Sequence, residues 1–569
     1  MAQVAVLITY REVFGKEPSL DDLHVMLKKY KRVEVLGLLA KLNCLLGTWQ
    51  NQPEFQLDSK LSALVLPTYN RAIQAIRRSS GGRILFSRLT ILYLVKQACM
   101  ACPSQGNPVN KQTAIEEIGV CCLMANDLAL TNMPSPMDGA LERLSSLLPF
   151  SDYVPHDEYL IDIARALLMF GEVTKLPTLT KRGDFLDLEA LFQHYMGLPP
   201  RDFCVLVFGA ATKYFNLKPE NLEASPEALL LRPQYFQKTN IDQQLVSQFF
   251  TRVAASEEKF ARQVSDARDR PGDDLTIIQR YPLVEVIEGL HLCLDPGFLV
   301  DKAGRGLYWS LFFEIKDNRE RLNLASFWGA VFEEYVNSIV ESSYSAGGQF
   351  IPAPKFANGD QAFDACLVED GALVVFEHKS SVLRADAKYS GDIRKLEEQL
   401  RSKFIRGDDD GAKGLAQLER SIRRFLDGEK VGDLGKGGIH TIYPVLVCLD
   451  RTLLSFYMNK YLNQWFPGHE LRKKYKKAVT PVFTVGISEL ERLLPYLHEI
   501  SFSGVLESYY RTNPTMLSSL SSSDVPILKN AKRGKDLLGE KFSKFTDEML
   551  TMFFGEDQGA APNEGEAIH

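Results

Sequence analysis

The sequence predicts a mixed α/β fold, in which a largely helical N-terminal half precedes a mixed β-sheet flanked by helices. Residues 1–270 repeat apolar positions at helical spacing, whereas strand and helix patterns alternate from residue 324 onward. The polar segment "SDARDRPGDD" at 265–274 separates the two regions. We therefore expect a helical domain over 1–270, an α/β domain over 275–505, and C-terminal helices with a disordered tail over 506–569.

The composition is that of a globular protein. The 569 residues are 45% hydrophobic and 24% charged, and a net charge of −6 gives no global signature of polyanion binding. The apolar start lacks the basic stretch and the cleavage site of a signal peptide, and no run approaches about eighteen uncharged apolar residues. We expect a cytoplasmic protein that does not use a membrane as a partner.

The helical half carries no chemical motif. Its first clear helical stretch, "SLDDLHVMLKKYKRVEVLGLLAKLNCLL" (19–46), opens on Ser19 and Asp22 in a capping-box pattern. Similar periodicity recurs in "EYLIDIARALLMFGEV" and "RDFCVLVFGAATKYF", without a repeat of fixed period. We interpret this half as a recognition or assembly domain for a protein partner, and a homo-oligomer stays open.

The cysteines predict reduced thiols. There are nine, an odd count and a low density for a chain of this length. Cys99-x-x-Cys102 followed by Cys121-Cys122 raises the alternative of a zinc site, but an adjacent pair suits tetrahedral ligation poorly. Because Cys99 also continues the helical run "LTILYLVKQACMAC", we expect buried core cysteines.

The second region alternates in the order helix, three strands, two helices, two strands. The first helix is "LASFWGAVFEEYVNSIVESS" at 324–343, and the turn "EDG" joins the strands "FDACLV" and "ALVVFEHK", with Gly371 supplying a positive φ. Before this region, the β-branched segment 276–295 predicts short strands. The remaining expected elements are a strand at 347–354, helices at 391–404 and 412–426, and strands at 441–450 and 480–487.

Two acids and a lysine converge on the hairpin. Successive side chains of a strand alternate faces, so Glu377 and Lys379 point the same way and His378 points the other way. The preceding "LVVF" is apolar at every position, as in a strand covered on both faces. A hairpin closing around 369–371 places Asp364 roughly opposite 376–377. The two carboxylates repel each other, and Mg²⁺, for which Mn²⁺ can substitute, would relieve that repulsion.

This arrangement resembles the PD-(D/E)xK nuclease superfamily, which has a restriction-endonuclease-like fold. The resemblance covers about residues 324–490. It places the family's first acid on Asp364 and its acid-x-lysine on Glu377 and Lys379. It implies that both acids bind metal and that the lysine positions a water for phosphodiester hydrolysis.

Two further family positions have matches here. "GAVFEEY" resembles the setting of a metal-supporting glutamate on the preceding helix, which falls on Glu333, with Glu334 as the adjacent alternative. "KGLAQLERSI" offers Gln417 for a glutamine on the helix after the acid-x-lysine strand. The sequence departs from the pattern at Phe363, where the family often has proline.

A rival triplet and several basic runs bear on the same question. Glu314-Ile-Lys316 with Asp301 has similar spacing, but "GLYWSLFFEIK" lacks a hairpin turn and predicts a helix. Local positive charge could contact phosphates, and it is densest in "LRKKYKKAV" (471–479), "RSKFIR" (401–406), Arg420, Arg423, Arg424 and "LKNAKRGK" (528–535).

We therefore predict a Mg²⁺-dependent deoxyribonuclease. The resemblance implies 5′-phosphate and 3′-hydroxyl ends, and many relatives with extra domains act in defence against foreign DNA, a role taken here by analogy only. RNA stays open as a substrate. The alternative is a catalytically inactive nucleic-acid-binding or scaffold protein that keeps the nuclease fold.

Overall fold

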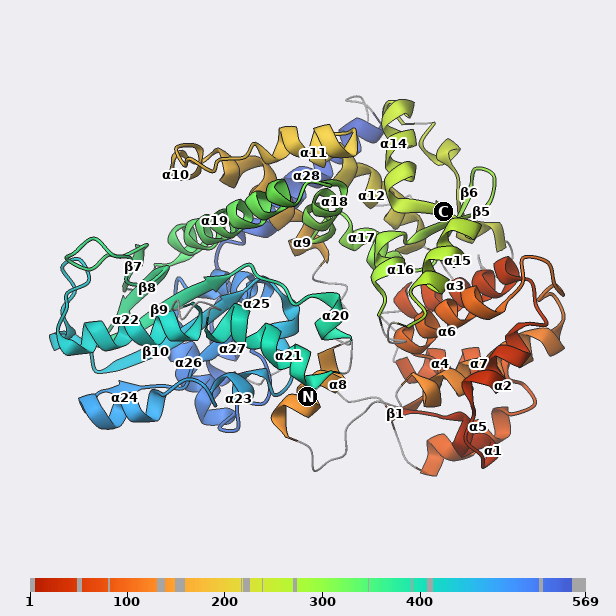
Figure 1. The fold of residues 1–569 in the computed structure, drawn as a ribbon, viewed down its shortest axis with the longest axis horizontal. Coiled ribbons are helices and arrows are strands. Elements are labelled where there is room, and N and C mark those ends of the chain that lie inside the picture. Colours follow the sequence, from red (N-terminus) through yellow and green to blue (C-terminus); the bar gives the residue numbers. More distant parts are fainter. Residues whose placement is uncertain are drawn as a thin grey trace. The chain divides into compact units, whose positions relative to one another are not determined.

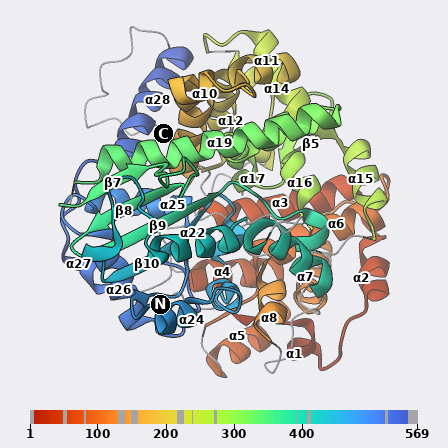
Figure 2. The ribbon, with the colours of Figure 1, turned by 60° about the vertical axis from the view of Figure 1, so that its left-hand side comes forward.

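The computed structural model describes most of the chain. The described residues are 6–48, 54–79, 82–129, 139–148, 159–215, 217, 226–237, 239–269, 274–345, 347–389, 392–406, 413–520 and 525–554. The predicted disordered tail (555–569) lies outside them. The fold is mixed α/β, as the sequence predicts (Figures 1 and 2).

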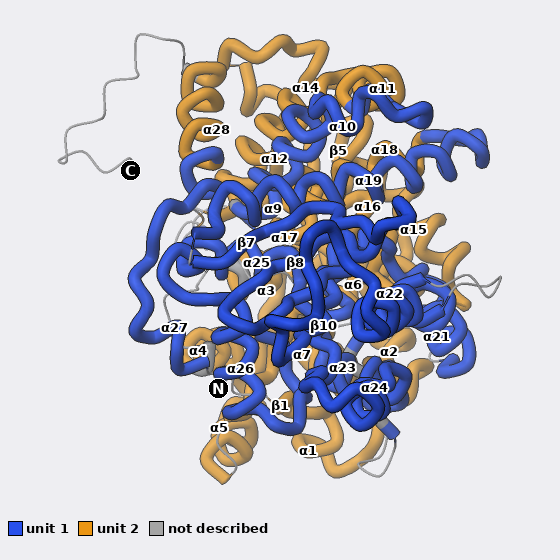
Figure 3. The backbone as a smooth tube through the Cα atoms, turned by 90° about the vertical axis from the view of Figure 1, so that its left-hand side faces the viewer, with its two compact units in different colours: residues 1, 134–188, 315–541 blue, residues 2–133, 189–314, 542–569 orange. Residues whose placement is uncertain are grey.

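The chain forms two compact units, each assembled from separate stretches of sequence (Figure 3). We call them the sheet unit (residues 1, 134–188 and 315–541) and the helical unit (2–133, 189–314 and 542–569). These units differ from the predicted ranges 1–270, 275–505 and 506–569. Strand pairing gives one physical reason. β5 (Leu283–Ile287) pairs with β4 (Ala254–Ser256), so the two strands on either side of the predicted boundary belong to one unit.

The helical unit is not entirely helical. Its four-stranded sheet has the order β3-β6-β5-β4, and β1 pairs with β2. Residues 276–295, predicted as strands, begin with the short helix α16 before β5 and β6. The strands are β1 (Val6–Leu7), β2 (Arg83–Ile84), β3 (Leu230–Leu231), β4, β5 and β6 (Leu290–Cys293). The helices are α1 (Tyr10–Phe14), α2 (Leu20–Leu27), α3 (Arg32–Thr48), α4 (Glu54–Val65), α5 (Asn70–Ser79), α6 (Arg88–Ala101), α7 (Gln112–Leu128), α11 (Leu188–Met196), α12 (Pro200–Phe215), α14 (Gln243–Val253), α15 (Glu257–Asp266), α16 (Thr276–Arg280), α17 (Pro296–Asp301) and α18 (Gly306–Glu314).

Local signals in the helical unit act as the sequence suggests. Ser19 and Asp22 form a reciprocal capping box at the start of α2. All nine cysteines of the chain are buried free thiols, which confirms the core interpretation. Burial raises the pKa of the Cys102 and Cys122 thiols to about 12, so both stay protonated at neutral pH.

The sheet unit is built around a six-stranded mixed sheet with the order β11-β10-β9-β8-β7, in which β12 also pairs with β10. β7, β8 and β9 run antiparallel, whereas β9, β10, β11 and β12 run parallel. The strands are β7 (Gln349–Pro352), β8 (Ala365–Glu369), β9 (Ala372–Lys379), β10 (Thr441–Cys448), β11 (Ala478–Val479) and β12 (Phe483–Gly486). The helices are α8 (Ala140–Leu147), α9 (Tyr159–Leu167), α10 (Pro177–Thr180), α19 (Asn318–Ser343), α20 (Ala385–Lys388), α21 (Ile393–Leu400), α22 (Leu415–Asp427), α23 (Met458–Leu462), α24 (Gly468–Tyr475), α25 (Ile487–Leu493), α26 (Phe502–Thr512), α27 (Pro526–Asn530) and α28 (Leu537–Phe554), the last of which continues into the helical unit.

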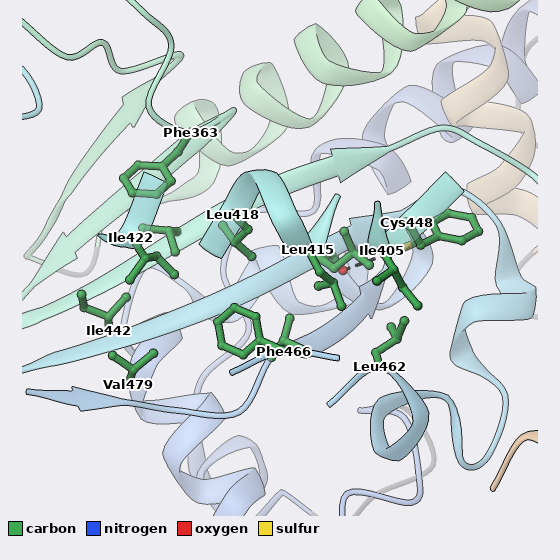
Figure 4. Close-up of a cluster of buried hydrophobic side chains, with 14 of the residues drawn as sticks. Phe363, Ile405, Leu415, Leu418, Ile422, Ile442, Cys448, Leu462, Phe466 and Val479 are labelled. Carbon is green, nitrogen blue, oxygen red and sulfur yellow. Dashed lines mark hydrogen bonds between the residues drawn. The ribbon is translucent and has the colours of Figure 1, made fainter. Parts of the chain in front are cut away.

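Both faces of this sheet are covered. Leu373 and Val375 of β9 join a buried core with α21 and α22, and Figure 4 shows part of this cluster. On the other face, Phe376 packs against Phe502 of α26 with ring centroids 5.5 Å apart. The alternation explains why the run "LVVF" is apolar throughout.

A buried ionic network ties residues of the 134–188 segment to the sheet unit. The Arg165 guanidinium of α9 donates to both Glu491 carboxylate oxygens of α25 at 2.6 and 2.5 Å and to Asp162 at 2.8 Å. The Tyr335 hydroxyl of α19 donates to Glu491 at 2.6 Å, and Arg451 donates to Asp162 at 2.7 Å. These interactions place α9 with the sheet, which the sequence did not indicate.

Glu369, the last residue of β8, holds the start of α26. It is 4% exposed and accepts hydrogen bonds from the backbone N–H groups of Phe502 and Ser503, both at 2.8 Å, and from the Tyr344 hydroxyl at 2.6 Å. A carboxylate at a helix N-terminus satisfies unpaired N–H groups and favours the helix dipole. Glu369→Ala should therefore destabilise the sheet unit by about 2 kcal/mol, and Glu369→Gln by less. Urea denaturation checks this expectation, and equal stability of wild type and Glu369→Ala would contradict it.

The structure also bears on the membrane prediction. Across the described ranges, the structure has no helix with the length and apolar character needed to cross a bilayer.

Candidate active site

The hairpin formed by β8 and β9 places the two predicted acids beside the same end of β9. β8 begins at Ala365, which pairs with Phe376, and the N–H of the preceding Asp364 donates to the Phe376 carbonyl at 3.2 Å, so Asp364 lies beside the end of β9 that carries Glu377. The turn uses Gly371 at φ 78°, in the left-handed region that glycine adopts readily. This pairing confirms the predicted hairpin. The hairpin could be predicted because strand alternation and turn residues are local signals in the sequence.

Glu377 and Lys379 share the face of β9 that also carries Leu373 and Val375. Glu377 is 1% exposed, and the Lys379 Nζ lies 2.6 Å from its Oε1. Burial raises the pKa of Glu377 to about 8; the nearby Asp364 adds to the rise, while Lys379 opposes it. Burial also disfavours the Lys379 ammonium, but Glu377 and Asp364 outweigh this effect and the net shift of its pKa is upward.

Asp364 is held at both carboxylate oxygens. Its Oδ2 accepts from the His378 backbone N–H at 2.7 Å, and its Oδ1 accepts from the Gln361 side-chain amide at 3.0 Å. Asp364 is 7% exposed, so its orientation is fixed by a buried network rather than by solvent. The backbone of β9 therefore supplies both the opposing acid and a hydrogen bond that aims Asp364.

α19 contributes Glu333 to the same group of charges. The pKa of Glu333 is raised to about 7 by burial and then by the charge of Asp364, which places the two carboxyls in one field. The Gln361 amide reaches both acids, with 3.4 Å from its Nε2 to Glu333 Oε1. The acid cluster, defined here as Glu333, Asp364 and Glu377, therefore gathers three of the five predicted site residues, and Lys379 contacts it directly.

Gln361 is a functional candidate that the sequence did not reveal. It precedes β8 in an irregular stretch, and its amide also donates to the Phe363 carbonyl at 3.3 Å. An isolated glutamine carries no motif, and its link to Glu333 depends on tertiary packing. Its position three residues before Asp364 is the one sequence signal that could have raised it.

Gln417 and Glu334 do not join the acid cluster. Gln417 is half-buried on the first turn of α22. Among the hydrogen bonds and ion pairs of the described residues, none links it to Asp364, Glu377 or Lys379, so its role stays a prediction. Glu334 is half-buried on α19, and its charge adds to the rise in the pKa of Glu333.

His378 points away from the acids, as the alternation predicts. It lies against Phe332 and Phe376, with ring centroids 6.5 and 6.3 Å away. Both ring nitrogens are buried and lack a hydrogen-bond partner within the described part of the chain. Burial lowers the pKa of His378 to about 4, so the ring is neutral and serves as a packing residue.

The basic runs are placed differently from the acids. The run 471–479 forms α24 and β11, and β11 pairs with the start of β10, which in turn pairs with Ala372. Ala372 and Lys379 are the two ends of β9, about 23 Å apart at the usual rise of a strand. This run therefore lies near the opposite end of the sheet from Lys379.

Other predicted cations have structural partners. Arg401 stacks on Trp465 at 4.0 Å, Arg423 pairs with Glu419, and Arg424 pairs with Glu429. In the tail, Arg533 pairs with Asp536 and Lys535 with Glu540. Exposed pairs of this kind leave less charge available for phosphate contacts.

The rival triplet begins at the end of a helix, and Lys316 lies in the residues after it. Glu314 ends α18, where it pairs with Arg252 at 2.9 Å. Asp301 ends α17 and pairs with Arg305 at 3.0 Å. These residues have structural partners in the helical unit and form no hairpin site.

The acid cluster offers oxygen ligands, which Mg²⁺ prefers. Mg²⁺ typically takes one or two carboxylates and keeps several waters. In the described ranges, no group of three or more His, Cys, Asp or Glu side chains is placed to hold a metal ion. Asp364 and Glu377 are oxygen donors of the type that Mg²⁺ or Mn²⁺ takes, and they differ from the Cys and His ligands typical of a structural zinc site.

Comparisons with protein-family models, curated proteins and solved structures find no match to this chain.

Proposed function

We propose that this protein is a metal-dependent nuclease that hydrolyses phosphodiester bonds in DNA, on a core of the PD-(D/E)xK type. The single observation that carries the proposal is the register of the β8–β9 hairpin. It brings Asp364, the residue before β8, to the end of β9, where its Oδ2 accepts from the His378 N–H at 2.7 Å and Lys379 is bonded to Glu377 at 2.6 Å. Independent surface charges would not produce this buried pairing.

Each residue has a distinct part in the proposed reaction. A divalent cation held by Asp364 and Glu377 would polarise a phosphoryl oxygen and lower the pKa of a bound water. The Lys379 ammonium lies beside the Glu377 carboxylate, where it can orient a water or offset negative charge that develops on the phosphate. Glu333 supports the site from α19 through Gln361.

A cleavage assay tests the proposal. Linear, circular and single-stranded DNA and RNA are each incubated with the full chain in Mg²⁺, Mn²⁺ or EDTA, alongside Asp364→Asn. We expect DNA cleavage that needs metal and is lost in the variant. Wild-type protein that is inert on every substrate would instead favour the non-enzymatic alternative. Metal-dependent cleavage that survives Asp364→Asn would reject the site assignment.

Gln361→Ala should weaken metal binding while leaving the fold intact. The amide donates to Asp364 and Glu333 without neutralising either acid, and loss of such an outer hydrogen bond typically costs about tenfold in metal affinity. Calorimetric titration with Mn²⁺ measures the effect without relying on activity. Asn358→Ala is the matched control, because Asn358 lies on the same loop and bonds Asp360 rather than the acids. Equal Mn²⁺ affinity in wild type and Gln361→Ala would contradict the role given to Gln361.

A further inference from the structure

An exposed cationic turn lies beside α19 in the sheet unit. Residues 181–185, "KRGDF", follow α10, which Figures 1 and 2 show next to α19. Phe185 fixes this turn, because its ring meets the Phe327 ring of α19 edge-on at 5.7 Å. Lys181 and Arg182 are both exposed, and a side chain added at Gly183 would meet only open space.

The anchoring contact places the turn within about two helical turns of the acids of α19. Phe327 and Glu334 are seven residues apart and so lie on one stripe of the helix, about 10 Å from each other. Consistent with this placement, the Asp184 bond and then the charges of Glu333 and Glu334 raise the pKa of Arg182. Arg182 therefore sits within electrostatic reach of the rim of the acid cluster.

The Arg182 side chain is oriented by Asp184, and this pairing occupies only part of its N–H donors. Its Nε and Nη2 donate to the two oxygens of Asp184 at 2.8 and 3.0 Å. A guanidinium carries five N–H donors in a planar fork, so this pairing takes one edge. The Nη1 edge has no hydrogen bond among the described residues, and it is the kind of edge that binds phosphate through two parallel bonds.

A phosphodiester that approaches Glu333, Asp364 and Glu377 meets repulsion before any metal bond forms. Opposing cations at the rim are needed to hold the backbone there. Lys379 is largely committed to Glu377 at 2.6 Å, and the basic run of α24 lies near the far end of the sheet. We propose that Arg182, oriented by Asp184 and assisted by Lys181, binds a backbone phosphate of the nucleic-acid substrate next to the acid cluster. This proposal rests on the proposed nuclease function.

The test measures binding apart from cleavage. A fluorescein-labelled DNA duplex of about 20 base pairs is titrated with the full chain in EDTA, and fluorescence anisotropy gives Kd at several salt concentrations. Arg182→Ala should raise Kd about tenfold at low salt and reduce the slope of log K against log salt by about one. Arg182→Lys should recover part of the loss, and Asp184→Ala should show a smaller loss than Arg182→Ala.

Arg511→Ala is the matched control. Arg511 is an exposed arginine on α26, and its side chain pairs with Glu507 at 3.2 Å. Its Kd and salt slope should equal those of wild type. If the Kd and salt slope of Arg182→Ala are also unchanged while wild type still cleaves DNA, the proposal for Arg182 is wrong and the nuclease proposal stands. If wild type neither binds nor cleaves DNA, both fail.

Discussion

Lys379→Ala should reduce metal-dependent DNA cleavage by about 10²- to 10³-fold, which is the usual loss when a single group that stabilises developing charge is removed. Its ammonium is the cation that directly contacts the acid cluster, at 2.6 Å from Glu377. Truncation to alanine removes the group that would orient the water or offset charge on the phosphate. Single-turnover cleavage at saturating Mg²⁺ measures the chemical step without product release.

The fold should tolerate this substitution. Burial raises the pKa of Glu377 to about 8 although Lys379 opposes the rise, so at pH 7 this carboxyl can be neutral and does not need a cation beside it. Melting temperatures of wild type and variant in EDTA check that the protein remains folded. Lys379→Arg keeps the charge but changes the shape of the donor, and it should recover only part of the activity.

Lys316→Ala is a matched control, because Lys316 completes another acid-x-lysine triplet, which starts at the end of α18. It should cleave DNA like wild type. Loss of activity in both lysine variants would point to general damage rather than to the acid cluster. Full activity in a folded Lys379→Ala protein would remove Lys379 from the mechanism.

The hairpin and its acids could be predicted because each signal is local. Strand alternation puts Glu377 and Lys379 on one face, and counting back from Gly371 places Asp364 beside the end of β9 that carries Glu377. The mixed α/β class followed from the same alternation of patterns along the chain. These features need no knowledge of which distant segments pack together.

The rest depends on contacts between residues far apart in sequence. Each compact unit is assembled from separate stretches of sequence. The pairing of β5 with β4 keeps the predicted boundary inside the helical unit, and the burial of Arg165 of α9 against Glu491 joins the α9 segment to the sheet unit. Neither pairing has a sequence signature. The sequence did not reveal Gln361 or Arg182 for the same reason, because the role given to each depends on its position beside α19. The basic run of α24 was visible in the sequence, but its place on the sheet was not.

The buried network around Arg165 gives the largest expected effect on stability. The side chains of Arg165 and Glu491 are 4% and 0% exposed. Removing one partner of such a pair leaves an uncompensated buried charge and costs about 3–5 kcal/mol. Arg165→Met roughly keeps the volume of the side chain but removes the cation beside the buried Glu491 carboxylate, which keeps the hydrogen bond from the Tyr335 hydroxyl. We therefore expect this variant to lose about that much stability.

A second substitution separates charge from packing. Adding Glu491→Gln to Arg165→Met removes the stranded charge and leaves an amide oxygen that can accept from Tyr335, so the double variant should be more stable than Arg165→Met alone. Urea denaturation gives the free energies, and hydrogen–deuterium exchange should show the loss of protection concentrated in α9 and α25. Arg511→Ala, which breaks an exposed pair, should leave both readouts unchanged. If the second substitution lowers stability further, packing rather than the buried charge holds α9 against the sheet.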